Sequence, residues 1–345
     1  MMRSLTARIP GAALILLLSV AGATGQDSGS AAAPIFKDTD PYEQPERKEP
    51  SMWHRPGAKT PTAQLALATQ YEQAKRLSRA ISANRALVHK WHNAPEAVTA
   101  QQNLARLLEA EGDHEEAFLE YQYLITYFAG QFAFLDTLDR QYRCANVLCH
   151  ADSSFLGLSS GSINDVRRMY ERILLNGPNW TKAPDVAMRI GELREVTEDL
   201  PEAIAAYEQV QNRFPGTEAA HNAAYRGSVC RSQFALLHPR DAKARNDAVA
   251  AMAAFLQKYP NDRLSESLRT YLKVLEGQTL EAAYAQAVFY DRQRHDRAAA
   301  MAAYRDFQRR FPDAPQAKAA AARLHVLERN APEAPRQGET NAVVR

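Results

Sequence analysis

Residues 157–161 carry a motif that could be catalytic. They read Gly-Leu-Ser-Ser-Gly, which fits the G-x-S-x-G spacing of a nucleophile elbow. In hydrolases that motif holds a serine on a strained turn between a strand and a helix, beside an oxyanion hole. Here it lies between two predicted helices, and no strand pattern precedes it. We therefore interpret these glycines and serines as part of a long turn.

The histidines and cysteines also lack the spacing of a reactive or metal site. His114 lies in Asp-His-Glu-Glu, without the H-E-x-x-H of zinc proteases, and we expect it to be exposed in the first turn of a helix. Cys144 and Cys149 are five residues apart on one predicted helix, so their side chains point apart and cannot form a bridge. Buried thiols are the first interpretation, and a bridge from Cys230 to one of them is the alternative. No catalytic residue, metal ligand or cofactor is expected.

The elements that position these residues are helices that repeat. From residue 62 to residue 329 apolar residues recur at intervals of three and four, and one template fits five times. The template is a small residue, then a large apolar residue four positions on, an aliphatic or aromatic residue three further, and usually proline after five more. Its matches are Ala117, Tyr121, Leu124 and Ala129; Val166, Tyr170, Ile173 and Pro178; Ala203, Tyr207, Val210 and Pro215; Ala248, Met252, Phe255 and Pro260; and Ala300, Tyr304, Phe307 and Pro312.

Each template position has a mechanical role. The small residue allows two helices to approach, the aromatic residue fills the gap between them, and proline ends the helix because it lacks an N–H. A partner helix precedes each match, with its own small residue 12 positions before the anchor in the first, third and fifth repeats. The residues expected to anchor the packing are Ala117, Tyr121, Gly191, Ala203, Tyr207, Pro215, Ala248, Pro260, Ala300, Tyr304 and Pro312.

Paired antiparallel helices of this kind are typical of the tetratricopeptide repeat, which has a period of 34 residues. Gly112-Asp113, Asp199 and Asp296 are expected at the turns within pairs. In the second and fourth repeats nine extra residues are expected in that turn, at Gly157 to Gly161 and at His238 to Asp241. The predicted fold is therefore all-α: a tetratricopeptide superhelix of about five helix pairs. One additional helix is expected at Tyr71 to His89, and a terminal helix at Ala314 to Glu328.

A stack of such repeats has a concave groove lined by solvated positions on the first helix of each pair. On this register the candidate groove residues for binding protein segments are Gln102, Arg106, Glu109, Met188, Glu192 and Glu195. The alternative is that these are only solvated residues of a helix surface. Trp180, in the turn after the second repeat, is expected to pack where two repeats meet.

The ends of the chain have a different composition. Residues 1–23 join a basic start at Arg3 and Arg8 to a short apolar run and small residues, which predicts a cleaved secretory signal peptide. Residues 24–62 are predicted to form a proline-rich, disordered linker, residues 63–329 the repeat domain, and residues 330–345 a disordered polar tail. The first cysteine is Cys144, so no cysteine follows the apolar run to carry a lipid.

Charge argues against a nucleic-acid partner. The chain has 42 Lys and Arg against 40 Asp and Glu; without Arg3 and Arg8 the two counts are equal. Nucleic-acid binding depends on neutralising phosphates, which a neutral chain does not favour. Protein partners and an exported, periplasmic location are expected.

Two stretches resemble, respectively, the last repeat of a known family and the long turn before its fourth helix pair. They are Ala287-Val288-Phe289-Tyr290 with Phe311-Pro312-Asp313, and Arg240-Asp241 with Tyr259-Pro260-Asn261-Asp262. The chain is similar there to the tetratricopeptide component of the outer-membrane β-barrel assembly machinery, the BamD family (also ComL or YfiO). The resemblance covers roughly residues 66–327.

This resemblance implies a scaffold that is not an enzyme. In the family, repeats near one end receive unfolded outer-membrane proteins and repeats near the other contact the barrel-inserting subunit. The family is normally anchored by a lipid on a cysteine, so this chain is expected to reach the outer membrane through partners. The alternative function is a soluble periplasmic tetratricopeptide protein that coordinates cell division or cell-wall synthesis.

Overall fold

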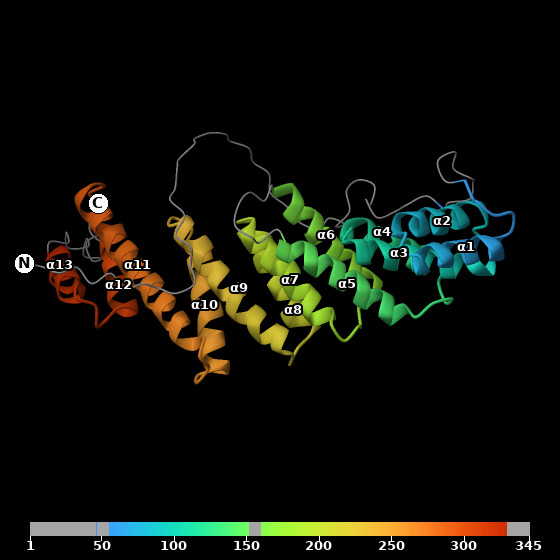
Figure 1. Cartoon of the computed structure of the whole chain (residues 1–345). Helices are drawn as coiled ribbons and strands as arrows, with labels where there is room; N and C mark the ends of the chain where they lie inside the picture. Colours follow the sequence, from blue (N-terminus) through green and yellow to red (C-terminus); the bar gives the residue numbers. More distant parts are fainter. Residues whose placement is uncertain (1–45, 47–54, 152–159, 330–345) are drawn as a thin grey trace, which may run out of the picture. The chain divides into compact units, whose positions relative to one another are not determined.

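The computed structural model describes residue 46, residues 55–151 and residues 160–329 (Figure 1). Every regular element in these ranges is a helix. The helices are α1 (Pro61–Gln73), α2 (Leu77–Lys90), α3 (Pro95–Glu111), α4 (His114–Tyr127), α5 (Phe134–Ala151), α6 (Ser160–Asn176), α7 (Ala183–Val196), α8 (Leu200–Arg213), α9 (Glu218–Leu237), α10 (Ala242–Lys258), α11 (Ser265–Arg292), α12 (Arg297–Arg310) and α13 (Ala317–Arg329).

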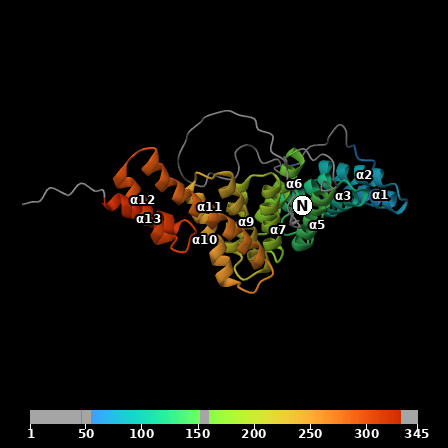
Figure 2. The ribbon, with the colours of Figure 1, turned by 90° about the vertical axis from the view of Figure 1, so that its left-hand side faces the viewer.

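Each helix packs against the next one along the chain. The order of the helices can be followed in both ribbon views (Figures 1 and 2). The predicted pairs are α3 with α4, α5 with α6, α7 with α8, α9 with α10, and α11 with α12. The all-α fold is confirmed, and α13 is the expected terminal helix. The single helix predicted for residues 71–89 is wrong. Two helices, α1 and α2, form a pair there, because the chain turns at residues 74–76.

Four of the turns within pairs contain one residue in the left-handed conformation. In the first repeat this is Gly112, with φ 91°, as a helix-ending glycine should be. The same conformation is taken by Lys75, Glu198 and His295, with φ 56°, 59° and 51°. An aspartate follows in three of the four turns. Asp113 and Asp296 accept a backbone N–H of the next helix, whereas Asp199 holds the cap position without such a bond.

The prolines end helices as predicted. Helices α8, α10 and α12 stop at Arg213, Lys258 and Arg310, two residues before Pro215, Pro260 and Pro312. The extra residues of the fourth repeat mostly lengthen α9, and only residues 238–241 remain as a turn. The corresponding residues 152–159 of the second repeat lie outside the described part of the chain.

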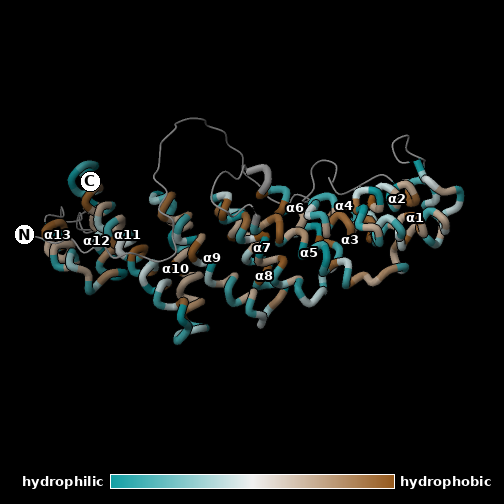
Figure 3. The backbone as a smooth tube through the Cα atoms, viewed as in Figure 1, coloured by the Kyte–Doolittle hydropathy of each residue, from teal (hydrophilic) through white to brown (hydrophobic). Residues whose placement is uncertain are grey.

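The packing anchors are buried between helices. Ala117, Ala203, Ala248 and Ala300 have no exposed surface, and Tyr121, Tyr207 and Tyr304 are almost fully covered. Gly191 is needed for this packing, because a Cβ atom there would lie 2.6 Å from Cε1 of Tyr207. Hydrophobic and hydrophilic residues accordingly alternate along the helices (Figure 3).

Helix α11 is unusual because its two halves belong to different cores. Leu268 and Leu275 pack with α10, whereas Ala287 packs with α12 and α13. Between them, residues 276–286 include no buried residue. Partly buried Leu280, Ala283 and Tyr284 also pack with the second core. With a rise of 1.5 Å per residue, Leu275 and Leu280, the nearest residues of the two cores, lie about 7.5 Å apart along the helix.

The predicted segment boundaries fall largely outside the described residues. The signal peptide (1–23), most of the linker (24–62) and the tail (330–345) are not described, so they stay predictions. In the described part of the linker, helix α1 begins at Pro61, and the N–H of Ala58 donates to Gln64 at 2.8 Å. Among the described residues no helix has the length and apolarity needed to cross a membrane.

Candidate functional site

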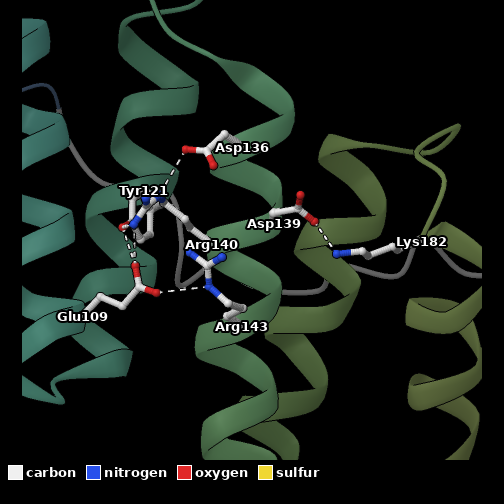
Figure 4. A network of polar contacts seen from close by, with 7 residues as sticks. All are labelled: Glu109, Tyr121, Asp136, Asp139, Arg140, Arg143 and Lys182. Atoms are coloured by element: carbon white, nitrogen blue, oxygen red, sulfur yellow. Dashed lines mark hydrogen bonds and ion pairs between the residues drawn. The ribbon is translucent and has the colours of Figure 1, made fainter.

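A polar network joins the first two repeats, with Glu109 of α3 at its centre (Figure 4). The carboxylate accepts a hydrogen bond from the Tyr121 hydroxyl of α4 at 2.7 Å. It also accepts from Arg140 of α5 at 3.2 Å and from Arg143 at 3.3 Å. Three helices from two repeats are therefore held by one side chain.

A second contact continues toward the third repeat. Asp139 of α5 accepts from Nζ of Lys182 at 2.6 Å, and this lysine precedes α7 (Figure 4). Nζ also lies 5.4 Å from the centre of the Trp180 ring, which meets Tyr142 edge-on. Trp180 is buried where two repeats meet, as predicted.

The same arrangement recurs in the third repeat. Glu195 of α7 accepts from the Tyr207 hydroxyl of α8 at 2.8 Å and from Arg226 of α9 at 3.0 Å. Arg226 also donates to Glu192 at 2.9 Å, and Glu192 accepts from Arg189 of its own helix.

The fifth repeat has an aspartate in this place. Asp291 of α11 accepts from the Tyr304 hydroxyl at 3.2 Å and from two nitrogens of Arg323 of α13, at 2.7 and 2.8 Å. The hydrogen bonds from Arg323 lower the pKa of Asp291, and burial raises the pKa of Tyr304 to about 12. Helix α13 thus donates to α11 in the same way as α5 donates to α3 and α9 donates to α7.

The second and fourth repeats lack the carboxylate. Tyr170 donates instead to the side-chain oxygen of Asn146 at 2.7 Å, and Met252 replaces the tyrosine in the fourth repeat. There the hydroxyl of Ser232 contacts the Met252 sulfur at 3.4 Å. These are the two repeats in which nine extra residues separate the small residue of the first helix from that of the second helix.

The networks hold helices of consecutive repeats together. Burial raises the pKa of Tyr121 and Tyr207 above their usual values, so the hydroxyls stay protonated at neutral pH. Burial likewise raises the pKa of Cys144 and Cys230 to about 12, which keeps both thiols protonated. Both are buried and free, as first interpreted; Cys149 is free but half-buried, so it is not a core thiol.

Most candidate groove residues take part in these networks. Arginines of the next repeat donate hydrogen bonds to the carboxylates of Glu109, Glu192 and Glu195. Arg106 donates to Glu72 of α1 at 2.6 Å. Gln102 is half-buried on α3. Met188 is not solvated as expected, because it packs in the core formed by α7, α8 and α9.

The sequence contains a signal for these contacts that was missed. Glu72 and Arg106, Glu109 and Arg143, and Glu192 and Arg226 are each 34 residues apart, which is one repeat. A carboxylate and an arginine at this spacing lie on adjacent first helices of consecutive pairs. Of the G-x-S-x-G motif, residues 157–159 lie outside the described part of the chain. Among the described residues no group of three or more His, Cys, Asp or Glu side chains could hold a metal ion.

Comparison with known proteins identifies the family. Residues 157–337, slightly more than half of the 345, match the YfiO family, whose description is outer membrane lipoprotein. The chain belongs to the YfiO family. No curated protein sequence matches it.

Two solved structures with similar helices are tetratricopeptide repeat proteins at low identity. One from Parabacteroides merdae is 11% identical, with 78% of this chain and 98% of that chain covered and a TM-score of 0.31. The C-terminal part of one from Cytophaga hutchinsonii is 15% identical, with 76% and 88% covered and a TM-score of 0.29. In this YfiO-family chain the assignment of the repeat therefore rests on the helix pairs and anchors described above.

Proposed function

We propose that this chain is a non-enzymatic scaffold of the cell envelope that takes part in the assembly of outer-membrane β-barrel proteins. Membership of the YfiO family is the observation that carries this proposal. The helix pairs supply a surface of repeated units, and such surfaces bind extended protein segments. The proposed partners are unfolded outer-membrane proteins and the barrel-inserting subunit.

The proposed client surface is the exposed side of the first helices, α3 and α7. Its candidate residues are Gln102, Arg106, Glu109, Glu192 and Glu195. The carboxylates here are covered by their arginines: the side chain of Glu109 is 18% exposed, whereas that of Arg143 is 53% exposed. The surface therefore offers guanidinium donors to a client and few free acceptors. Such donors suit the carbonyl groups of an extended chain and its acidic side chains.

We further propose that the mature protein is exported and is held at the outer membrane by a partner. The family is described as lipoproteins, yet the first cysteine of this chain is Cys144, which is buried in α5. Attachment through another subunit reconciles the family with this sequence.

Site-specific photocrosslinking tests the client surface. A photoreactive residue at Gln102 of α3 is compared with one at Glu115, which is exposed on the second helix of the same pair. We expect adducts with outer-membrane protein precursors from position 102 and not from position 115. Equal adducts from both positions, or none with such precursors, would contradict the proposed surface.

A further inference from the structure

Two grooves in this chain lie at equivalent places in consecutive repeats. The first, of about 540 Å³, lies where α8, α9 and α10 meet, and the second, of about 350 Å³, lies between α11 and α12. On α10 the first is lined by Asp247, Ala250, Ala251 and Ala254, and on α12 the second is lined by Ala299, Ala302, Ala303 and Asp306. Each residue of the second set lies 52 positions after its counterpart, as anchor Ala300 does after Ala248.

The first helices of these pairs match in the same way. Ala224 and Arg231 of α9 line the first groove, and Ala283 and Tyr290 of α11, each 59 positions later, line the second. The two grooves are thus the same crevice between the first and second helix of a pair. Their alanines leave room for another backbone to approach closely.

The grooves differ in one wall. Helix α8 closes the first with Glu208, Gln211 and Asn212, which lie on one face of that helix. The seven residues that line the second groove all come from α11 and α12. Helix α8 is the second helix of the preceding pair. The equivalent helix for the second groove is α10, and none of its residues lines that groove.

The length of α11 explains the missing wall. Along α9 the residues that pack with α8 alternate with those that pack with α10. Ala219, Ala223 and Cys230 belong to the core that includes α8. Ala224, Tyr225 and Val229 pack against the core that includes α10. Along α11 they follow one another: residues up to Leu275 pack with α10, and residues from Leu280 onward pack with α12. Helix α10 therefore packs on the N-terminal half of α11, away from the groove.

Helix α13 does not fill this place. It contacts a different side of α12, where Arg305 pairs with Glu328 at 2.6 Å and Arg297 donates to the carbonyl of Leu327. These α12 positions are 297 and 305, whereas the groove is lined by positions 299, 302, 303 and 306.

We infer that the groove between α11 and α12 binds an amphipathic helix of a partner protein, seated as α8 is seated against α9 and α10. The charged and polar residues that line the groove indicate which side chains that helix must carry. Glu208 of α8 pairs with Arg231, but Tyr290 takes the place of Arg231 here, so no acid is required. Asp306 takes the place of Ala254, and its present partners are Arg309 and Arg310 of its own helix. The partner helix therefore presents small apolar residues to the alanines and a side-chain N–H donor to Asp306. This inference does not depend on the assembly role proposed above.

The chain supplies its own probe for this groove. A fluorescein-labelled peptide of residues 199–216, held helical by a lactam bridge on its solvent side and carrying Glu208→Gln, reproduces the face of α8. Its binding to the full-length protein is followed by fluorescence anisotropy. We expect saturable binding that Ala302→Arg weakens at least tenfold. Ala321→Arg, on the exposed side of α13, is the matched control and should leave the affinity unchanged.

Two further variants separate the alternatives. Ala250→Arg, at the counterpart position of the first groove, should not change binding, and Asp306→Ala, which removes no buried group, should weaken it several-fold. Equal affinity of the wild-type and Ala302→Arg proteins, or loss of binding with Ala250→Arg, would overturn the inference. A wild-type dimer in sedimentation that Ala302→Arg makes monomeric would assign the groove to a second copy and would also overturn it.

Discussion

Gly191 is the residue on which the packing of the third repeat depends most closely. Its missing side chain makes room for the ring of Tyr207, which is fully buried and tied to Glu195. We expect Gly191→Ala to lower the free energy of unfolding by about 1–3 kcal/mol, because the ring cannot move away. Urea denaturation measures this, and an unchanged midpoint would show that α7 and α8 do not approach as described.

Asp291 makes the stability of the last repeat depend on pH. Its hydrogen bonds from Arg323 hold the pKa below the usual 3.8, so the ionised carboxylate favours the folded state. This contribution is complete above pH 3.8 and is lost as the pH falls through the lowered pKa.

The variant Asp291→Asn should therefore be less stable than the wild type at pH 7. The difference should narrow below about pH 3.8, where the wild-type carboxyl also becomes neutral in the unfolded chain. Denaturation series at pH 7 and pH 3 test this. A difference of constant size would show that Asp291 acts through its shape and not its charge.

Among single residues, the anchors could be predicted from sequence and the polar partners could not. Ala203 and Tyr207 follow from a template that recurs because every repeat packs alike. The repeat register predicts a solvated position for Met188 on the first helix of its pair. In the stack α7 packs against both α8 and α9, and Met188 belongs to the core that these three helices share.

At the scale of elements, α11 has a weak point near its centre. Gly277 lies where no side chain is buried, and a Cβ atom there would meet no other atom within 4 Å. Gly277→Ala should raise the free energy of unfolding by about 0.5–1 kcal/mol, because alanine favours the helix more than glycine does.

Hydrogen exchange of the amides near residue 277 provides the local readout for this variant. We expect slower exchange there in Gly277→Ala than in the wild type. Faster exchange or a lower unfolding midpoint would mean that the helix needs the freedom of glycine at this point.

Element boundaries could be predicted where glycine, proline or aspartate mark them. Gly112-Asp113 and the proline stops gave the correct turns. The turn between α1 and α2 was missed because it has Lys75 in the left-handed position and Arg76 at the cap, and neither is typical of a turn. The length of α11 was missed because an uninterrupted apolar pattern does not reveal which core each half joins.

At the scale of the whole molecule, stability should be local. Each helix contacts chiefly its neighbours along the chain, and the core of α12 and α13 shares only α11 with the core before it. Phe307→Ala, which empties a buried site in that last core, should remove exchange protection from α12 and α13 and leave α2–α4 protected. Loss of protection at the same rate in all helices would show one cooperative unit instead.

The central claim is that this YfiO-family chain works in outer-membrane assembly through protein partners. The most direct measurement is a crosslinked pull-down of the tagged full-length protein from whole envelopes, with the captured proteins identified by mass spectrometry. Recovery of the barrel-inserting subunit is the predicted result. Its absence, with division or cell-wall synthesis proteins recovered instead, would contradict the assembly role while leaving the repeat fold intact.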